Sequence, residues 1–404
     1  MLIEFSIANF RSFDQRQSLN MVASPATEHL QTHARDAGVR NVAPLLLSAA
    51  IYGANGAGKS NLLRGFWTLR NMVLNSAREG MRGDELPYEP FGLNKKLPTE
   101  FEVVFIAEGK RWQYGLKYDN KRVIEEYLVV YKTQKPTRVF ERQYDLDTDG
   151  YHWSFQKPID RERFEALVRP NALALSVLGG QFGTSELIAA FDWFSQSRVL
   201  NTHAPKLRSG AKVNADALGK VFPYIQAIDP TLMHSRITER TGELQINDEQ
   251  PTIETFHPRI EFCHQTPDGD QMWLDLYKES QGTQQLYRLM EQLLSAIENG
   301  YTTFVDEHDN SLHPLLARSL VALFHDTIRN AAGAQLVFAT HDATMLDLDL
   351  LREDQIWFVE KKPNLSTELY SLADIKGRHG GIEKGYLQGK FGAIPLLGSP
   401  LANG

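Results

Sequence analysis

Cysteine is almost absent from this chain of 404 residues, which contains a single one, Cys263. One cysteine excludes an intrachain disulfide and a zinc site built from cysteines, and it fits the reducing cytosol. No apolar run approaches the roughly 18 residues that a membrane-spanning helix needs. The first residues, MLIEFSIANF, include an acidic residue and lack the basic start and apolar centre of a signal peptide. We therefore expect a cytoplasmic protein without a membrane partner.

Positive charge is not in excess either, because 43 Lys and Arg stand against 50 Asp and Glu, which gives a formal net charge of -7. This balance gives no support to nucleic-acid binding, although it leaves room for a local basic groove. Internal repeats and sustained heptads are also missing, so we expect no long coiled coil. With 42% hydrophobic and 23% charged residues, the composition is that of a globular protein with two or three subregions.

The most specific motif is residues 53–60, GANGAGKS, which fits the phosphate-loop pattern G-x-x-x-x-G-K-[ST]. It follows the apolar run PLLLSAAIY, which predicts a buried strand, and precedes apolar residues at helical spacing. In such a loop the backbone N–H groups and the helix N-terminus bind phosphate, Lys59 reaches the β and γ oxygens, and the Ser60 hydroxyl ligates Mg²⁺. The alternative is an accidental glycine turn, which the flanking strand and helix disfavour. The sequence therefore predicts binding of a nucleoside triphosphate.

The chain divides by pattern into four parts. Residues 1–100 begin with an alternating strand at 2–10, which we expect in the same sheet as the phosphate loop. Residues 101–159 contain short β-rich runs separated by turn-like pairs such as Asp-Asn and Asp-Gly, which predict an antiparallel β subdomain. Residues 160–254 show apolar residues at helical spacing and predict a mainly helical insertion. Residues 255–404 return to alternating helices and strands.

The last part contains the clearest helix of the sequence, with apolar residues at i, i+3, i+4, i+7, i+8 and i+11 from Leu286 and a stop at Gly300. Strands are predicted at 302–305 and 335–339, with a helix opened by Pro314 between them and helical spacing again in ATMLDLDLL. Strands that alternate with helices imply a largely parallel sheet, which binds its ligand at the carboxyl ends of the strands.

An acidic pair closes the first of these two strands. Asp306 is placed to hold Mg²⁺ through water, and Glu307 to orient or deprotonate the water that attacks a phosphate. The alternative is a solvated acidic loop, but the preceding Phe304 and Val305 favour an inward-pointing carboxylate. We therefore expect the two adjacent carboxylates to divide the roles of metal ligand and base.

Two further segments suit the same chemistry. His341 follows the second strand at the same sheet edge, where it could contact the γ-phosphate, and the alternative is an ordinary residue of a capped loop. Residues 280–283, SQGT, open the clearest helix and offer a second anion-binding helix start. Because the phosphate loop already occupies one helix N-terminus, this second one suits a nucleotide held by another subunit. Its alternative is a simple Ser-x-x-Thr cap.

The motifs in their order, NFRSF, GANGAGKSN, ESQGT, FVDEHDNSLHP and ATHD, resemble the ATPase heads of the ATP-binding-cassette (ABC) superfamily. The segments LIEFSIANFRSF, SLHP and IEKGYLQGKFGAIP more closely resemble the RloA-like family of stand-alone bacterial ATPases, which is associated with phage defence and abortive infection. Both ends and the last third of the chain carry this resemblance, and residues 160–254 only loosely. It implies an α/β fold, namely an ABC-type P-loop NTPase head with a mixed, largely parallel sheet, an antiparallel β subdomain and a mainly helical insertion.

The resemblance also implies roles for individual residues. Asp306 corresponds to the Walker B aspartate that holds Mg²⁺ together with Ser60, Glu307 to the catalytic base and His341 to the switch histidine. Lys59 is then a catalytic residue as well as a ligand of the phosphates. The residues that correspond to nucleotide-binding positions, in the Walker A loop, the NFRSF segment and the signature motif, are Gly53, Ala54, Asn55, Gly56, Ala57, Gly58, Lys59, Ser60, Asn61, Arg11, Ser12, Ser280 and Gly282.

Some parts of the family pattern are less regular. Residues 311–313 match the D-loop, but His308 stands where an apolar residue is common. A metal site of His308 with His313 is disfavoured, because no third ligand is evident. The glutamine of the Q-loop is not identifiable, and Glu100 and Glu102 lie in the region where it should fall.

The resemblance implies an enzyme that binds ATP and Mg²⁺, hydrolyses ATP to ADP and phosphate, and pairs with a second copy across the nucleotide as a homodimer or higher oligomer. Its expected function is a nucleotide-dependent dimerisation switch or scaffold in bacterial anti-phage defence, controlling a separate effector protein such as a nuclease or toxin. A separate effector is expected because the overcoming-lysogenization-type and anticodon-nuclease relatives append a catalytic module without a counterpart here. The alternatives are a DNA-repair or chromosome-maintenance ATPase of the recombination-head type and, less favoured, the energising subunit of a membrane transporter.

Overall fold

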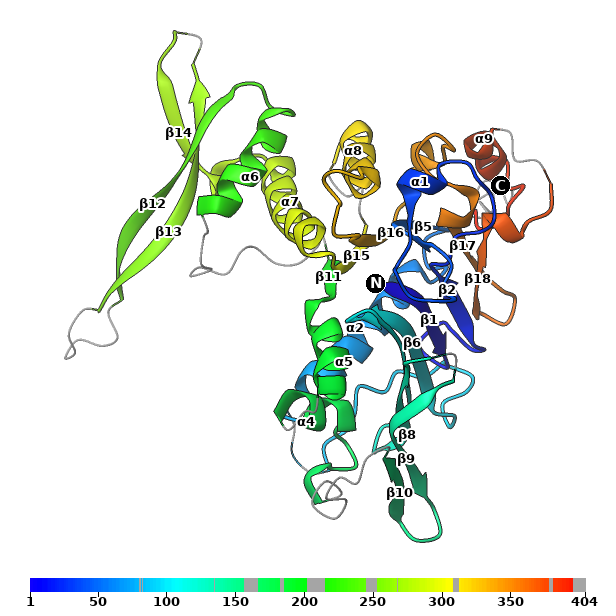
Figure 1. Cartoon of the computed structure of the whole chain (residues 1–404). Coiled ribbons are helices and arrows are strands. Elements are labelled where there is room, and N and C mark those ends of the chain that lie inside the picture. Colours follow the sequence, from blue (N-terminus) through cyan, green and yellow to red (C-terminus); the bar gives the residue numbers. More distant parts are fainter. Residues whose placement is uncertain are drawn as a thin grey trace, which may run out of the picture.

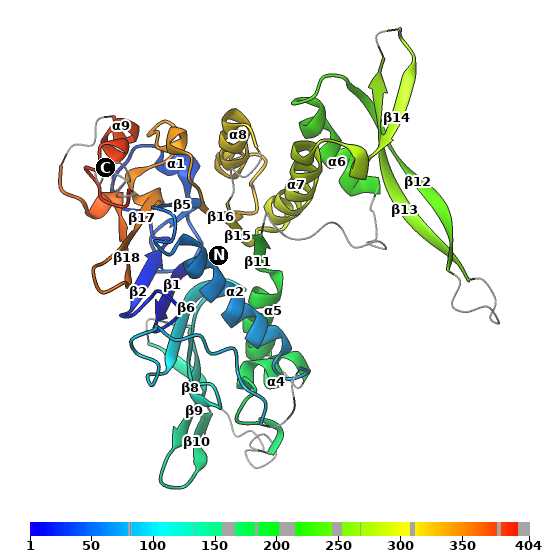
Figure 2. The ribbon, with the colours of Figure 1, turned by 180° about the vertical axis from the view of Figure 1, so that it is seen from behind.

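The computed structural model shows a head built on two large β-sheets, from which a smaller sheet projects as an arm (Figures 1 and 2). A short two-stranded sheet lies beside the head sheets. The structure describes residues 1–79, 81, 83–133, 135–155, 166–181, 185–201, 215–244, 253–266, 268–307, 312–377 and 381–394.

Five parallel strands and one antiparallel edge strand form a six-stranded sheet in the order β11-β15-β16-β5-β17-β18. The five residues of β5 are all buried, as expected for a strand that is covered on both faces. Ala49 and Ile51 enter one hydrophobic core, and Ala50 and Tyr52 enter another on the opposite face. The largely parallel sheet predicted from the sequence is thus confirmed. Its strands are β5 (Ser48–Tyr52), β11 (Arg198–Asn201), β15 (Thr302–Asp306), β16 (Gln335–Ala339), β17 (Ile356–Lys361) and β18 (Thr367–Ser371).

Three helices that pack on this sheet are α2 (Lys59–Asn75), α7 (Gln281–Asn299) and α8 (Pro314–His325). Phe66 of α2 stacks on Phe304 of β15, with ring centroids 4.0 Å apart. The predicted stop of α7 is confirmed, because Gly300 ends the helix with a φ of 70°. A Cβ atom at this glycine would lie only 2.6 Å from the Ala332 carbonyl oxygen, so both the backbone angle and the space require glycine.

The second large sheet is antiparallel, with seven strands in the order β10-β9-β8-β7-β6-β1-β2. The expectation that the first strand joins the sheet of the phosphate loop is wrong, because β1 pairs with β2 and β6 in this sheet. Phe5 and Ile7 of β1 enter the core, while Ser6 donates a hydrogen bond to Glu4 on the other face. One apolar and one polar face are typical of an antiparallel strand. The strands are β1 (Leu2–Ala8), β2 (Gln17–Asn20), β6 (Thr99–Ala107), β7 (Lys110–Tyr118), β8 (Val123–Tyr131), β9 (Thr137–Asp145) and β10 (Gly150–Phe155).

The side chain of Gln335, the first residue of β16, joins the two large sheets. Its Oε1 accepts a hydrogen bond from the backbone N–H of Leu2 at 2.5 Å. Its Nε2 donates to the carbonyl oxygens of Leu2 at 3.0 Å and of Leu46 at 2.9 Å. Gln335 is fully buried, so these bonds satisfy polar groups that water does not reach. Leu46 lies in β4 (Leu45–Leu46), which pairs with β3 (Ala34–Arg35).

A buried ion pair joins the antiparallel sheet to α4 (Ala174–Gln181). Arg142 Nε donates to Glu126 at 2.9 Å, and both side chains have no exposed surface. The backbone N–H groups of Ala174 and Leu175 donate to the same carboxylate at 2.7 and 2.9 Å. Tyr114 donates its hydroxyl to it as well, at 2.9 Å, and burial first of all raises the pKa of that phenol. The carboxylate thus sits at a helix start with its lone pairs satisfied.

The arm is a three-stranded antiparallel sheet of β12 (Leu232–Leu244), β13 (Ile253–Gln265) and β14 (Gln271–Asp275). Both views show it projecting away from the head, with α6 (Ala215–Gln226) and α7 at its base (Figures 1 and 2). The single turn η1 (Leu276–Lys278) leads from β14 to the start of α7. His264 of β13 lies 2.8 Å from the carboxylate of Glu279, which immediately precedes Ser280.

The region 160–254 is therefore only partly helical. Its described residues form the helices α4, α5 (Ser185–Gln196) and α6, but also the strands β11 and β12. The β-branched Ile237 and Thr238 suit a strand, and the long partner β13 stabilises β12 over its whole length. Nearly all of β13 lies beyond residue 254, where the sequence analysis ended the helical insertion. The local pattern of residues 160–254 therefore did not reveal the pairing.

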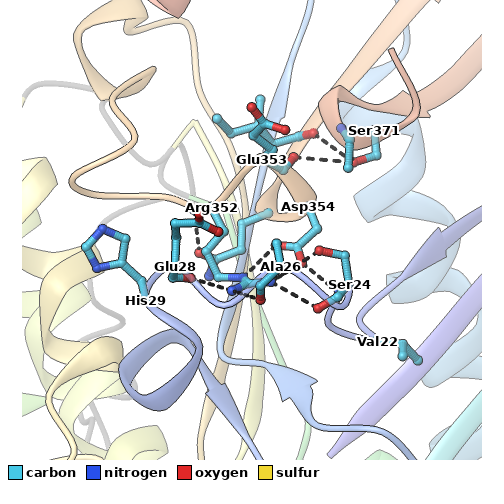
Figure 3. A network of polar contacts seen from close by, with 12 residues as sticks. Val22, Ser24, Ala26, Glu28, His29, Arg352, Glu353, Asp354 and Ser371 are labelled. Carbon is cyan, nitrogen blue, oxygen red and sulfur yellow. Dashed lines mark hydrogen bonds and ion pairs between the residues drawn. The ribbon is translucent and has the colours of Figure 1, made fainter. Parts of the chain in front are cut away.

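A buried arginine, Arg352, joins the segment after β2 to the residues that precede β17 (Figure 3). Arg352 is 4% exposed and donates to Asp354 at 2.9 Å and to the carbonyl oxygen of Ala26 at 3.1 Å. The backbone N–H of Ser24 donates to the same aspartate at 2.8 Å.

The following helix α1 (Leu30–His33) packs against α8. The other described short elements are η2 (Ala343–Met345), η3 (Glu353–Gln355), η4 (Leu372–Asp374) and α9 (Ile382–Leu387).

The helix expected in ATMLDLDLL reduces to the single turn η2, so this expectation is wrong. Asp342 accepts a hydrogen bond from the backbone N–H of Thr344 at 2.9 Å, and Asp347 accepts one from Asp349 at 3.0 Å. Aspartate side chains that bond backbone N–H groups two residues ahead form turns that compete with a continuous helix.

Replacing Arg142 by Met should lower the free energy of unfolding by about 3–5 kcal/mol, because it leaves the Glu126 carboxylate buried without its cation. Urea denaturation measures this change. The exposed Arg138 of the same strand, which pairs with Glu141, provides the control Arg138→Met, which should cost less than about 1 kcal/mol. Equal losses for the two variants would contradict the structural role of the buried pair.

Candidate nucleotide-binding site

The carboxyl ends of three neighbouring parallel strands meet at one edge of the six-stranded sheet. The register pairs Val305 of β15 with Phe338 of β16, and Phe338 with Ala50 of β5. The segments that leave these strands therefore start side by side: the phosphate loop after β5, the acidic pair at the end of β15 and His341 after β16. The sheet order thus brings together the three motifs that the sequence analysis placed at one edge.

The phosphate loop, residues 53–58, runs between β5 and α2 in a conformation that requires glycine. Gly58 has a φ of 123°, which residues with a side chain rarely adopt. A Cβ atom there would lie 2.3 Å from the hydroxyl oxygen of Thr367. The helix α2 begins immediately afterwards at Lys59, so its free backbone N–H groups face the loop. Asn55 and Gly56 at the loop tip are exposed.

Lys59 lies under the loop and is only 6% exposed. Its Nζ donates to the carbonyl oxygens of Gly53 at 2.6 Å and Ala54 at 3.3 Å. The same Nζ lies 3.3 Å from Nδ1 of His341. An ammonium group can only donate, so Nδ1 accepts and the proton of a neutral imidazole is on Nε2. A cation and an N–H donor are thus placed together at the loop.

Ser60 and Asp306 form the second contact across the site. The Ser60 hydroxyl donates to Asp306 Oδ1 at 3.1 Å. Burial is the largest influence on this carboxyl and raises its pKa, and the neighbouring Glu307 carboxylate raises it further. A hydroxyl and a carboxylate are hard oxygen ligands of the kind that Mg²⁺ prefers, so these two residues fit the implied metal ion. Glu307 follows with a φ of 52°, a left-handed conformation that is uncommon for a residue with a side chain.

Arg11 and Ser12 contact the first turn of α2 through Asn61. Arg11 Nη1 donates to Asn61 Oδ1 at 3.2 Å, and Asn61 Nδ2 donates to the Ser12 hydroxyl at 2.8 Å. Arg11 also forms an ion pair with Glu89. The structure therefore places the NFRSF segment against the first turn of α2, directly after the phosphate loop. Sequence reasoning missed Glu89 and Thr367, since neither lies in a motif and only the fold places them there.

Ser280 and Gly282 do not join this cluster. They lie at the start of α7, beside the base of the arm, and the Ser280 hydroxyl accepts a local hydrogen bond from the backbone N–H of Thr283 at 3.1 Å. With Leu312 and His313 they line a separate pocket of about 120 Å³ between α6, α7 and α8. No residue of the phosphate loop lines this pocket.

The remaining sequence predictions have mixed outcomes. His308 and residue 311 of the D-loop match lie outside the described residues, and His313 caps α8 by accepting from the Leu315 N–H at 3.3 Å. Glu100 and Glu102 lie on β6, where they pair with Lys117 and Arg16 respectively. In the described part of the chain, no three His, Cys, Asp or Glu residues lie close enough to hold a metal ion.

Comparison with protein families matches residues 48–347 to the family described as "AAA domain, putative AbiEii toxin, Type IV TA system". The chain belongs to this family. The match contains the phosphate loop, the acidic pair and His341, so it includes all three segments that meet at the sheet edge. The AAA-family chain thus carries its phosphate loop on a mixed, largely parallel sheet, with a second, antiparallel sheet beside it.

The solved structures that are similar to this AAA-family chain include two SMC head domains. One is the SMC head domain from Thermotoga maritima, with 14% identity, a TM-score of 0.42 and coverage of 93% of this chain and 99% of that chain. The other is the Smc head domain from Pyrococcus furiosus, with an extended coiled coil and bound to the C-terminal domain of ScpA, with 10% identity, a TM-score of 0.41 and coverage of 92% and 96%. At these values the likeness carries no further conclusion. Comparison with curated proteins gives no significant match.

None of the helices in the described ranges has the length and apolar character that crossing a membrane requires.

The pH dependence of stability tests the environment of Asp306. Because burial favours its protonated form in the folded state, the ionised carboxylate costs stability once the pH rises above the unfolded value near 3.9. Asp306→Asn removes this cost, so the nucleotide-free variant should unfold at a higher temperature than the wild type at pH 8. The difference should shrink as the pH falls toward 4. Thermal unfolding followed by circular dichroism measures both.

The exposed Asp349 provides a matched control, since Asp349→Asn changes the net charge equally but lies outside the site. A lower unfolding temperature for Asp306→Asn than for Asp349→Asn at pH 8 would show that the carboxylate is not destabilised by its surroundings.

Proposed function

We propose that this protein is an ATPase that binds ATP with Mg²⁺ at the carboxyl edge of the six-stranded sheet and hydrolyses it to ADP and phosphate. The observation that carries the proposal is the meeting of Lys59 with His341 and of Ser60 with Asp306, which come from three distant segments. Membership of the AAA family supports it. ATP is the substrate of this reaction.

Each side chain supplies one part of phosphoryl transfer, which depends on positioning and charge neutralisation. Lys59 and the loop N–H groups bind the β and γ oxygens. Ser60 and Asp306 hold Mg²⁺, which neutralises phosphate charge when it is bound. Glu307 orients the attacking water and accepts its proton. His341, next to the lysine, contacts the γ-phosphate and responds to its loss.

The second half of the site comes from another copy of the chain. Ser280 and Gly282 offer a helix N-terminus for an anion, but the pocket that they line contains no residue of their own chain's phosphate loop. A two-fold homodimer places each signature motif over the nucleotide of the other subunit and creates two equivalent sites. ATP then holds the subunits together, and hydrolysis removes the γ-phosphate that both subunits contact.

The biological role that fits best is a nucleotide-dependent switch in anti-phage defence, of the RloA-like kind, which controls a separate nuclease or toxin. The family description names a toxin and a toxin–antitoxin system, which supports a defence setting. The formal net charge of -7 gives the alternative, a DNA-repair ATPase, no electrostatic support.

Glu307→Gln should leave the affinity for ATP within about twofold of the wild type and lower kcat by at least about 100-fold, because the base is lost while the binding groups remain. Phosphate-release assays and isothermal titration with ATP measure the two effects. Glu298→Gln, at an exposed carboxylate near the end of α7, should retain turnover. Normal phosphate release by Glu307→Gln would refute the assignment of the base.

The same variant reports on the dimer. With ATP and Mg²⁺, Glu307→Gln should have a molar mass of at least twice that of the monomer by light scattering, since the nucleotide that joins the subunits is not consumed. Adding Ser280→Arg should return it to the monomer without loss of ATP binding, whereas Ser319→Arg on the exposed face of α8 should not. A Ser280→Arg variant that still dimerises would exclude the proposed closure.

The biological role is tested by two measurements on the wild type. In the proposed role, double-stranded DNA leaves the ATPase rate unchanged at low and high salt, and a nuclease or toxin encoded beside this protein co-purifies with it in an ATP-dependent manner. Strong stimulation by DNA that falls with salt would favour the repair role instead.

A further inference from the structure

The hairpin of β17 and β18 packs directly against both ends of the phosphate loop. A Cβ atom on Gly53 would lie 2.5 Å from the carbonyl oxygen of Val359 in β17, and one on Gly58 would lie 2.3 Å from the hydroxyl oxygen of Thr367 in β18. By contrast, a Cβ atom on Gly56 at the tip would meet nothing within 4 Å. The loop is therefore supported from the side of the hairpin and open at its tip.

Thr367 makes the polar contact of this support. Its side chain is 3% exposed, and its hydroxyl donates to the carbonyl oxygen of Ala57 at 2.6 Å. The hydroxyl oxygens of Thr367 and Ser12 lie 2.8 Å apart, and Ser12 in turn accepts from Asn61 Nδ2 at 2.8 Å. A hydroxyl has one proton, so the bonds form a chain from Asn61 through Ser12 and Thr367 to the loop backbone.

We propose that Thr367 is a positioning residue for ATP, which it does not touch: its hydroxyl fixes the peptide between Ala57 and Gly58 in the orientation that binds phosphate. This inference rests on the function proposed above. A peptide unit is planar and trans, so its C=O and N–H groups point in opposite directions. A carbonyl of Ala57 held toward Thr367 turns the N–H of Gly58 to the opposite side of the loop, away from the hairpin.

The backbone around Thr367 holds the hydroxyl in place independently of the side chain. The N–H of Thr367 donates to the carbonyl oxygen of Ser12 at 2.7 Å, and the N–H of Leu369 donates to Gln17 Oε1 at 2.8 Å. These contacts join β18 to the antiparallel sheet and do not depend on the threonine hydroxyl. A substitution by the isosteric valine therefore removes the bond to Ala57 and keeps the strand in register.

The loop N–H groups contact phosphate in the ground state and in the transition state alike, so loss of their alignment should act on binding and not on chemistry. Thr367→Val should raise the Kd and the KM for ATP about tenfold, equivalent to about 1.4 kcal/mol, with kcat within about twofold of the wild type. Thr367→Ser, which keeps the hydroxyl, should stay within about twofold in all three. Isothermal titration with ATP and steady-state phosphate release give these values.

A purely structural role for Thr367 would lower the unfolding temperature of the nucleotide-free protein and leave the KM unchanged in the folded fraction, and that result would overturn the inference. So would a Thr367→Val variant with the Kd of the wild type, or one that loses kcat and keeps its KM. Ser371→Ala, further along β18, controls for general weakening of the strand and should not change the Kd.

If instead the wild type binds ATP no better than Lys59→Ala, the proposed function itself fails, and the inference fails with it.

Discussion

Parallel pairing of β5, β16 and β15 is the constraint on which the site depends. These strands bring residues far apart in the chain to one edge, because neighbouring parallel strands end at the same side of a sheet. Once the apolar strand residues are buried, the register of these strands fixes the positions of Lys59, Asp306 and His341. The chemistry of the site is thus fixed by hydrophobic burial in the sheet, at positions that carry no functional group themselves.

The second sheet supports the first from the side. Gln335 bonds the start of β16 to β1, while Thr367 and Ser12 connect the far end of the parallel sheet to the phosphate loop. The Glu126–Arg142 pair holds α4 against the antiparallel sheet. All these contacts are buried or partly buried polar bonds between segments distant in sequence. Such bonds specify one arrangement of the sheets, since an alternative packing would leave the same groups without partners.

The sequence alone predicted those parts of the fold that are determined by local chemistry. The phosphate loop, the acidic pair and the stop of α7 at Gly300 depend on residue type and short spacing. The position of β1, the strand β12 and the missing helix after His341 depend on partners or on competing turns, which a local pattern does not contain. Thr367 is the extreme case, because a threonine in an ordinary strand has no distinguishing feature until the fold brings it against Ala57.

A short link connects the arm to the start of α7. Residues 276–280 alone separate the end of β14 from the first residue of α7, and the His264–Glu279 contact braces this short link. With 13 residues each, the two long strands of the arm are roughly 40 Å long. In the homodimer proposed above, a force applied to the arm would therefore be transmitted to Ser280, the residue proposed to cover the nucleotide of the other subunit, and closure of the dimer would move the arm in return.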